Sequence, residues 1–346
     1  MIGKKDKKRG AILVFVLGLV VLLGALCLRL MEETVQELRH VSQYHKRDDL
    51  RRHAYSLLDI TVGVMQEFRQ LDGNTLKTGG GWRDPLIWSN LSPLDSRVKW
   101  SVSFKGESGK LPLFSTNEKV LKEIFAVMHT GGEGIVDEDD GRPFYDAWMD
   151  WQDADDNKRD EGAEDEFYED LITPYYTPGK DVQSFEEFRM IRGFYYDPDD
   201  PRNSGLFFDE FGNENENMKN FRKSFSFYHE GKVNICEASP FLLRYMSGDD
   251  DSLYDELLAY DPYGNKDFGS IDTPIAYTKG NNETFIVEIF VERGKARFEL
   301  HIVLSVDQKT TPKSPANKAD IRSEQNKKLN YPFRILRLRE NENLID

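Results

Sequence analysis

A strongly apolar segment preceded by basic residues is the feature that most constrains this chain. Five lysines and arginines lie between Lys4 and Arg9, and an uncharged, proline-free apolar run follows from Ala11 to Leu28. An α-helix of that run measures about 27 Å, close to the hydrocarbon thickness of a bilayer. Basic residues before such a run favour retention of that end in the cytoplasm. The sequence therefore predicts that everything after Arg29 lies outside the inner membrane.

Three interpretations fit this segment: a cleaved secretory signal peptide, an uncleaved signal anchor, and a pilin-like leader cut on the cytoplasmic side after Gly10. A signal peptidase site should follow small residues in an alternating pattern, and residues 23–27 (LGALC) do not provide one. The basic residues that directly abut the apolar run favour the pilin-like leader. The segment alone leaves all three interpretations open.

The net charge of the chain indicates which kinds of molecule it can bind. The formal charge is −15, and the leader carries five bases and one acid, so cleavage after Gly10 leaves −19. This charge argues against nucleic acid as a partner, because a phosphate backbone requires a basic patch. The two cysteines, Cys27 and Cys236, lie in the apolar run and far downstream, so we expect no disulfide between them. Such an exported chain relies on its core or on bound ions.

The helical pattern continues beyond the apolar run as far as residue 71. Between residues 54 and 68 the apolar residues recur at three- and four-residue steps, as on one face of an amphipathic helix. Alternating residues then predict a strand over 98–104. A turn-forming segment follows, and residues 110–114 are expected to pair back as the second strand of a hairpin. Ser115 and Glu118 have the spacing of a capping box before the next helix.

The middle of the chain is acidic and aromatic. Residues 133–170 contain 17 acids against three bases, with interleaved aromatics that indicate folded helices and loops, in which Trp148 and Trp151 anchor the core. A helix is predicted over 184–193, with Ser184 and Glu187 as its capping box. Residues 196–219 are rich in Gly, Asn, Asp and Pro and predict an exposed loop.

The end of the chain predicts strands over 285–291, 296–306 and 331–338, with a mobile loop at 307–330. Together these patterns predict an α+β fold, with a long N-terminal helix, an antiparallel sheet and a large inserted α-helical domain. We expect the following organisation: leader 1–10; N-terminal helix 11–71, of which 11–28 spans the membrane; first part of the sheet domain 72–114; helical insertion 115–250; and remainder of the sheet domain 251–346.

Five segments, in order, resemble the K type of type II secretion minor pseudopilin. They are the leader KKDKKRG with AILVFVLGLVVLLGAL, the segment SFKGESGKLPL, AWMDWQDADD followed by GAED, TPYYTPGKDVQSFEEFRMIRG, and GKVNICEASPFLLRYM. The resemblance covers most of residues 5–306. The chain departs from the family pattern at Gly179, Phe188 and Cys236, which indicates an outlying branch.

The resemblance implies a non-enzymatic assembly subunit. Prepilin peptidase would cut between Gly10 and Ala11, and Ala11 would become the methylated amino terminus. Most pilins carry Glu at the fifth mature position, whereas this chain has Phe15, and the K type lacks that Glu. A subunit at the filament tip has no preceding amino terminus to pair with such a Glu, and an unpaired carboxylate in the membrane is costly.

The same resemblance implies a tip complex with the I- and J-type minor pseudopilins. The protein would cap the pseudopilus and help to initiate its assembly for protein export. It would cross the inner membrane once, with its C-terminal domain in the periplasm. The alternative is a signal-anchored periplasmic protein that binds ligands in a calcium-dependent way or acts on carbohydrate.

The acidic segment is a candidate calcium site. Its side chains Asp153, Asp155, Asn157 and Glu164 occupy positions 1, 3, 5 and 12 of an EF-hand-like register. Position 6 is Lys158 instead of Gly, which excludes a true EF-hand. Hard oxygen ligands still suit Ca²⁺ in an exported protein, and the family resembles calcium-binding pseudopilins. A solvated acidic surface is the competing interpretation, and the aspartates at 249–251 and 255 are a second candidate site.

Catalysis has little support in the sequence. The six histidines show no metal-ligand spacing, and no nucleophile elbow, P-loop or dinucleotide fingerprint is present. We therefore predict no catalytic residues.

Overall fold

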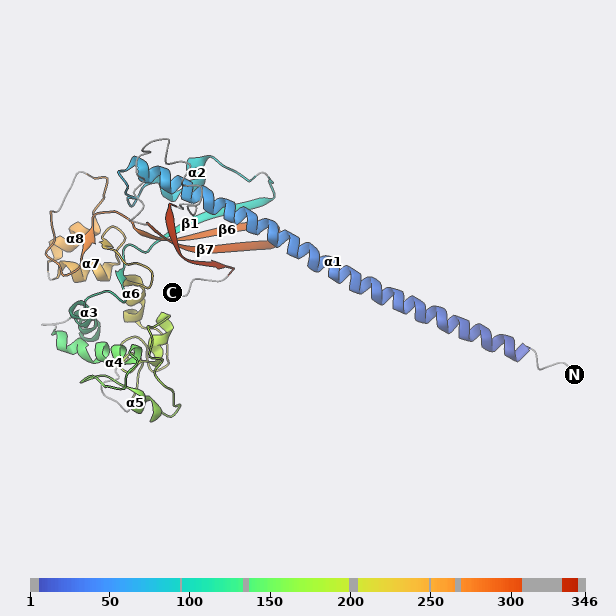
Figure 1. The fold of residues 1–346 in the computed structure, drawn as a ribbon, viewed down its shortest axis with the longest axis horizontal. Helices are drawn as coiled ribbons and strands as arrows, with labels where there is room; N and C mark the ends of the chain where they lie inside the picture. The colour runs from blue at the N-terminus through green and yellow to red at the C-terminus, as the bar shows by residue number, and fades with distance from the viewer. Residues whose placement is uncertain are drawn as a thin grey trace, which may run out of the picture.

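The longest element of the computed structural model is α1 (Asp6–Leu71), which projects far beyond the rest of the chain (Figure 1). The structure describes residues 6–93, 95–132, 137–198, 205–248, 250–264, 269–306 and 332–341. No proline interrupts α1, and the chain turns away at Gly73, whose φ of 66° suits glycine. Residues Val14–Glu37 are long and apolar enough to cross a membrane, and none of that segment is buried within the protein.

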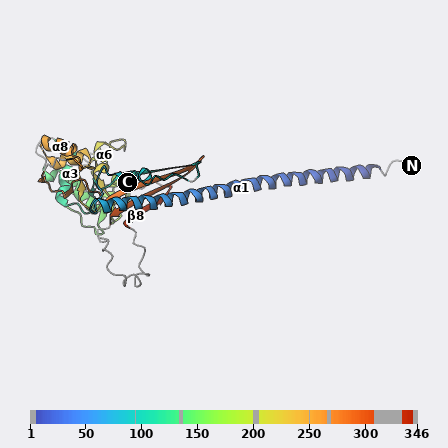
Figure 2. The same ribbon diagram turned by 90° about the horizontal axis from the view of Figure 1, so that it is seen from above.

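The second half of α1 packs against one face of a sheet, as Figure 2 shows from above. Its predicted apolar face is confirmed, because Ala54, Leu57, Leu58 and Met65 are all buried against the sheet strands. The remaining helices and strands follow in chain order: η1 (Gly81–Arg83), α2 (Pro85–Ser89), β1 (Val98–Gly106), β2 (Leu111–Pro112), α3 (Glu118–Thr130), η2 (Glu138–Gly141), α4 (Arg142–Gln152), α5 (Asp165–Glu169), η3 (Phe185–Met190), α6 (Glu216–Ser224), β3 (Phe225–Ser226), β4 (Val233–Asn234), α7 (Pro240–Ser247), α8 (Asp251–Leu258), β5 (Tyr277–Thr278), β6 (Thr284–Arg293), β7 (Ala296–Val306) and β8 (Phe333–Glu340).

The sheet has the order β1-β6-β7-β8, and all its neighbours are antiparallel. Strands from the beginning and the end of the chain therefore share one sheet, as expected. Strands β6 and β7 form a hairpin that closes between Arg293 and Ala296. The alternation in β7 is confirmed, since Phe298, Leu300 and Ile302 all face α1 in the core. The predicted fold class, α+β with a long N-terminal helix, is confirmed.

The expected hairpin between residues 98–104 and 110–114 is wrong. Strand β1 pairs with β6, and β2 pairs in parallel with β3. The hydroxyl oxygen of Ser108 accepts hydrogen bonds from the backbone N–H groups of Glu283 and Thr284, both at 2.8 Å. Gly109 lies so close to the backbone of Glu237 that an added Cβ would approach it to 2.2 Å. These contacts direct the chain out of the sheet, so turn-forming residues lead into another region and not into a hairpin.

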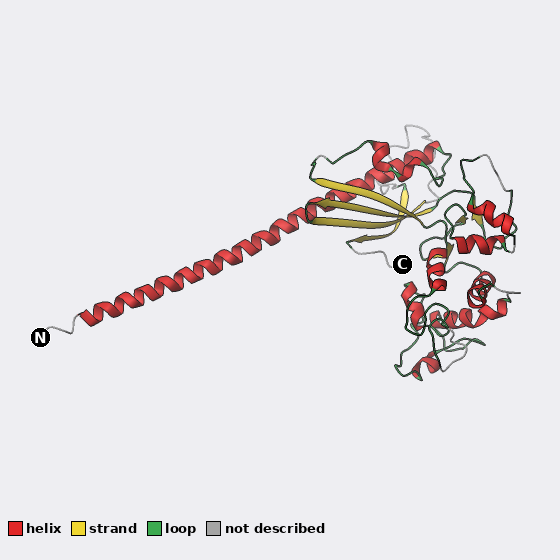
Figure 3. Cartoon of the chain, turned by 180° about the vertical axis from the view of Figure 1, so that it is seen from behind, coloured by secondary structure: helices red, strands yellow, loops and turns green. Residues whose placement is uncertain are grey.

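Residues 107–283, which run between β1 and β6, form a second region, called the insertion below. Its helices gather apart from the sheet in Figure 3. Its buried apolar side chains lie between Leu111 and Ile275 and form a cluster that shares no residue with the cluster under α1. The expected bounds of this region were 115 and 250. Trp148 and Trp151 are both buried in its cluster, as predicted.

Three local predictions in the insertion are wrong. Asn117, not Ser115, caps α3, because its side chain accepts a hydrogen bond from the backbone N–H of Lys119. The segment after Ser184 is the 3-10 helix η3, and the Ser184 side chain makes no capping hydrogen bond. Glu187 instead accepts from the Trp151 indole N–H at 2.9 Å and the Gln183 backbone N–H.

The stretch from 196 to 219 is not simply an exposed loop. Leu206, Phe207 and Phe208 are buried, and α6 begins at Glu216. Aromatic packing thus outweighs the polar composition of the flanking residues. The expected mobile loop at 307–330 lies outside the described residues. The last strand, β8, begins at Phe333 and ends at Glu340, two residues beyond the expected end.

A buried polar junction joins the two regions. The Asn234 side-chain amide donates hydrogen bonds to the Thr78 hydroxyl at 2.9 Å and to the Asn282 carbonyl oxygen at 2.8 Å. The Asn282 amide also donates to Thr78, and the Thr78 hydroxyl donates to Glu237. Arg83 forms an ion pair with the same Glu237 carboxylate. Through Thr78 and Arg83, the insertion is thereby attached to the segment that follows α1.

Candidate functional site

The acidic residues of the insertion converge at the end of α4. This helix begins at Arg142, with Pro143 in its first turn, and ends at Gln152. The next residue, Asp153, has an extended backbone conformation. One face of α4 buries its tryptophans, and Asp150 lies on the same helix with no exposed surface. The following loop returns at Glu164, the residue before α5.

Three carboxylates meet there. Ligand oxygens of Asp150, Asp153 and Glu164 all lie within 4.8 Å of one another. The Arg159 guanidinium donates from Nη1 to Asp150 Oδ1 and to Asp153 Oδ2, both at 2.6 Å. Gly162 closes the loop over Asp150, because a Cβ at this position would lie 1.9 Å from Asp150 Oδ2.

The charge of this cluster is only partly balanced. Glu164 Oε1 and Asp153 Oδ1 are buried and have no hydrogen-bond partner in the described part of the chain. Burial and the neighbouring Asp150 and Asp153 raise the pKa of Glu164 to about 7. Burial also raises the pKa of Asp150, against the opposing effect of Arg159. Buried carboxylate oxygens without donors are the arrangement that a hard cation would stabilise.

The structure brings together two of the four side chains expected to bind calcium. Asp153 and Glu164 belong to the cluster. Asp155 and Asn157 are exposed, and Asp155 Oδ1 accepts hydrogen bonds from the backbone N–H and side-chain amide of Asn157. The EF-hand-like register therefore does not describe this loop. Sequence reasoning missed Asp150, which precedes Asp153 by one helical turn, and that spacing is the signal that could have identified it.

The second acidic segment shows capping and ion pairing. Asp250 caps α8 by accepting from the Leu253 backbone N–H at 3.0 Å. Asp251 pairs with Arg244 at 2.6 Å. Asp249 lies outside the described residues. Among the described residues, no acids of this segment belong to a group of three or more that lie close enough together to hold a metal ion.

The predicted processing residues lie at the start of α1. Gly10 and Ala11 are within the helix, and Phe15 is 72% exposed on its surface. Exposed apolar residues continue along α1 to Val35, which includes Leu30 and Met31 beyond Arg29. Such a helix requires either lipid or other helices to cover it.

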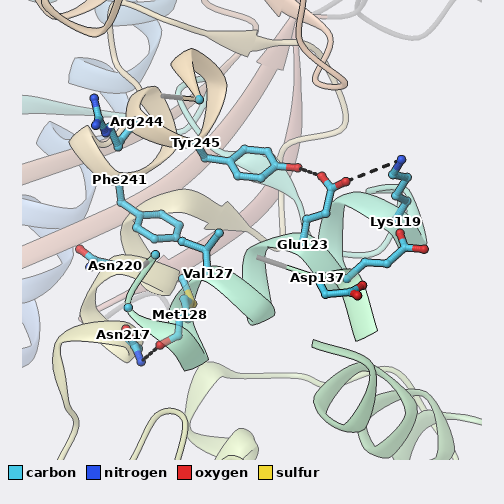
Figure 4. A pocket seen from close by; sticks show the side chains of 14 residues that line it. Lys119, Glu123, Val127, Met128, Asp137, Asn217, Asn220, Phe241, Arg244 and Tyr245 are labelled. Carbon is cyan, nitrogen blue, oxygen red and sulfur yellow. Dashed lines mark hydrogen bonds and ion pairs between the residues drawn. The ribbon is translucent and has the colours of Figure 1, made fainter. Parts of the chain in front are cut away.

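A cleft of about 1170 Å³ lies between α3, α6 and α7 (Figure 4). Val127, Met128 and Phe241 supply its apolar wall. Glu123 accepts a hydrogen bond from the Tyr245 hydroxyl and lies 3.8 Å from the Lys119 ammonium. Sequence analysis did not predict this cleft, because three elements distant in the chain form it. Glu123 is already paired there, so the cleft offers a surface and not a reactive acid.

Comparisons with known proteins show what this chain resembles. Residues 132–198, which include the carboxylate cluster, match the family model described as type II secretion system (T2SS), protein K. No curated protein matches the sequence. One similar solved chain is from the crystal structure of the GspK-GspI-GspJ complex of the enterotoxigenic Escherichia coli type 2 secretion system. It is 11% identical, the alignment covers 89% of this chain and 100% of that chain, and the TM-score is 0.48. The family match supports the resemblance to the K-type minor pseudopilins over residues 132–198.

Proposed function

We propose that this chain caps the tip of a type II secretion pseudopilus and helps to initiate its assembly for protein export. The observation that carries the proposal is the insertion, a region with its own core that lies beyond the end of α1 and the sheet (Figure 1). In a filament of subunits packed through their α1 helices, such bulk would obstruct the next subunit above it. The family match within the insertion supports the same role.

The proposal gives each part of α1 a task. Prepilin peptidase cuts between Gly10 and Ala11, and the new amino terminus at Ala11 is methylated. Residues 11–28 hold the subunit in the inner membrane before assembly, with the rest of the chain in the periplasm. Phe15 replaces the glutamate of other pilins, so no unpaired carboxylate is buried at the tip. The role is that of an assembly subunit and not of an enzyme.

The I- and J-type minor pseudopilins are the proposed partners. The similar solved chain comes from a GspK-GspI-GspJ complex. In this chain, Leu30, Met31 and Val35 form an exposed apolar stretch on α1 beyond residue 28. Helices of the partners would cover that stretch and exclude water from it.

The mass of the mature amino terminus in the native host tests the proposal. We expect a chain that begins at methylated Ala11, and we expect Gly10→Val to abolish the cut. Gly24→Val is the matched control, since a side chain at Gly24 meets nothing within 4 Å. Cleavage near Ala25 or an intact Met1 would instead support the alternative, a signal-anchored periplasmic calcium-dependent or carbohydrate-active protein, and would end the pseudopilin proposal.

We also propose that the carboxylate cluster binds one calcium ion. Asp150, Asp153 and Glu164 would supply oxygen ligands, with the unpartnered oxygens of Asp153 and Glu164 as the first contacts. Calcium titration calorimetry should show binding that Asp153→Asn weakens at least about tenfold. Asp155→Asn is the matched control and should bind calcium as the unaltered chain does. Equal effects of the two substitutions would reject this location for the ion.

A further inference from the structure

Strand β8 is an edge of the sheet with an unusual distribution of charge. Among the described strands it has a neighbour, β7, on one side only. The register places Arg334 opposite Ser305, Arg337 opposite Val303 and Arg339 opposite His301. Directly opposed residues of an antiparallel pair share a face, so all three arginines lie on the face of the sheet away from α1.

The acid of β8 lies on the opposite face. Glu340 accepts hydrogen bonds from Arg51 and Tyr55 of α1, both at 2.7 Å. It is therefore committed to the contact between the strand and α1. The outward face of β8 carries three positive charges and no acid of its own, in a chain whose net charge is −15.

The acids of the neighbouring strands on that face are matched by other cations. Glu288 of β6 accepts from Lys105 of β1 at 2.7 Å. Glu299 of β7 pairs with Arg297 at 2.7 Å. On this face of the described sheet, the arginines of β8 therefore lie beside strands whose acids are paired with other cations.

A small apolar patch lies beside the arginines. Ile286 and Val303 are buried there, with Leu336 and Tyr228 packed against them. Tyr228 comes from the insertion, and its hydroxyl accepts a hydrogen bond from Arg337 at 3.2 Å. The surface therefore combines a sheet edge, a row of guanidinium groups and an apolar contact contributed by both regions of the molecule.

We propose that the β8 edge and its arginines bind an extended acidic segment of a partner protein, which adds to the sheet as a further antiparallel strand. Backbone groups on the outer side of β8 would pair with the segment, and its carboxylates would meet the guanidinium groups. An edge strand can also carry charge simply to prevent aggregation. The single sign of the charge and the adjacent apolar patch favour recognition. A lipid phosphate would meet the arginines but has no backbone to continue the ladder. The inference does not depend on the proposed tip position.

A capped peptide of alternating Val and Glu, labelled at one end, is the probe. Its fluorescence anisotropy is measured against the full chain in dodecyl maltoside, an uncharged detergent. We expect saturable binding that weakens at least about tenfold when Arg334, Arg337 and Arg339 are all changed to Gln. The triple change to Lys should retain most of the binding. Arg52→Gln, an exposed arginine of α1 paired with Asp49, is the matched control and should have no effect.

Three further measurements separate the alternatives. The same peptide with Lys in place of Glu should not bind, and one with a central Pro should bind more weakly because a ladder hydrogen bond is lost. Amide hydrogen exchange in residues 333–340 should slow when the Val–Glu peptide is added. Equal binding of the Glu and Lys peptides, unchanged exchange in β8, or binding to phosphatidylglycerol vesicles in place of the peptide would each overturn the proposal. Circular dichroism of each variant confirms that a loss of binding is not a loss of fold.

Discussion

The sheet and the insertion bury their apolar side chains in differently built cores. Under α1 the core is largely aliphatic, and each strand is fixed to its neighbour by a long ladder of hydrogen bonds. The insertion has short helices and mostly two-residue strands, and its core is rich in aromatic rings. Phe125 alone lies near Phe144, Trp148, Phe194, Phe207 and Phe221. A region with little regular structure is thus held by a few large side chains, so its stability should depend on fewer positions.

The first prediction tests that concentration. Phe125→Ala should cost the insertion about 3–5 kcal/mol, because a fully buried ring and its aromatic contacts are lost. Leu300→Ala, at an equally buried site in β7, is the matched change in the sheet and should cost about 2–5 kcal/mol. Region-resolved hydrogen exchange on the full chain measures both. If Phe125→Ala lowers protection equally in β6 and β7, the two regions form one cooperative unit and the comparison fails.

Removal of calcium should destabilise the insertion by less than Phe125→Ala does. A chelator should lower the unfolding temperature of the insertion. The loss in the free energy of unfolding should be about 2.7 kcal/mol if calcium had been present at 100 times its dissociation constant. Exchange in the sheet should not change, because the carboxylate cluster lies wholly in the insertion. Differential scanning calorimetry with and without chelator provides the measurement, with Asp153→Asn as the variant that should no longer respond. An unchanged unfolding temperature would contradict structural calcium.

The smallest expected effect concerns the junction between the regions. Asn234→Ala removes the side-chain hydrogen bonds to Thr78 and Asn282 and the one that Asn234 accepts from the Cys236 backbone N–H, and should cost about 1–3 kcal/mol. Both regions should then unfold less cooperatively, which would appear as a wider separation of their calorimetric transitions. Asn220→Ala in α6 is the control and should leave that separation unchanged. A loss confined to the insertion would show that the junction stabilises one region without coupling the two.

Much of the sheet region could be predicted from the sequence because its signals are local and periodic. Leu57 and Met65 recur at helical spacing, and Phe298, Leu300 and Ile302 alternate as a half-buried strand requires. The hairpin prediction failed because the partner of β1 is β6, almost 180 residues later, and a turn signal does not specify the partner.

The insertion was harder to predict because its contacts are irregular and distant. Phe207 and Phe208 lie in a polar stretch, yet both are buried. Rings from α3, η3 and α6 pack around Phe207, and the Arg189 guanidinium lies over the Phe208 ring. The carboxylate cluster was only half predicted for a similar reason. Asp153 and Glu164 were among the four residues expected to bind calcium, whereas Asp150 contributes from inside a helix, where an acidic residue ordinarily faces solvent.

The sheet ladder also defines how the insertion is attached to the chain. Gly106, the last residue of β1, is the register partner of Phe285 in β6. The chain therefore leaves the sheet and re-enters it at adjacent points, so a short turn from Gly106 to Phe285 would complete an ordinary hairpin. The helix and sheet contain all the strand pairings of a smaller subunit, and the insertion is an addition at one loop. The insertion is thus a modular extension, which can change in size or surface while the helix and the sheet keep their shape.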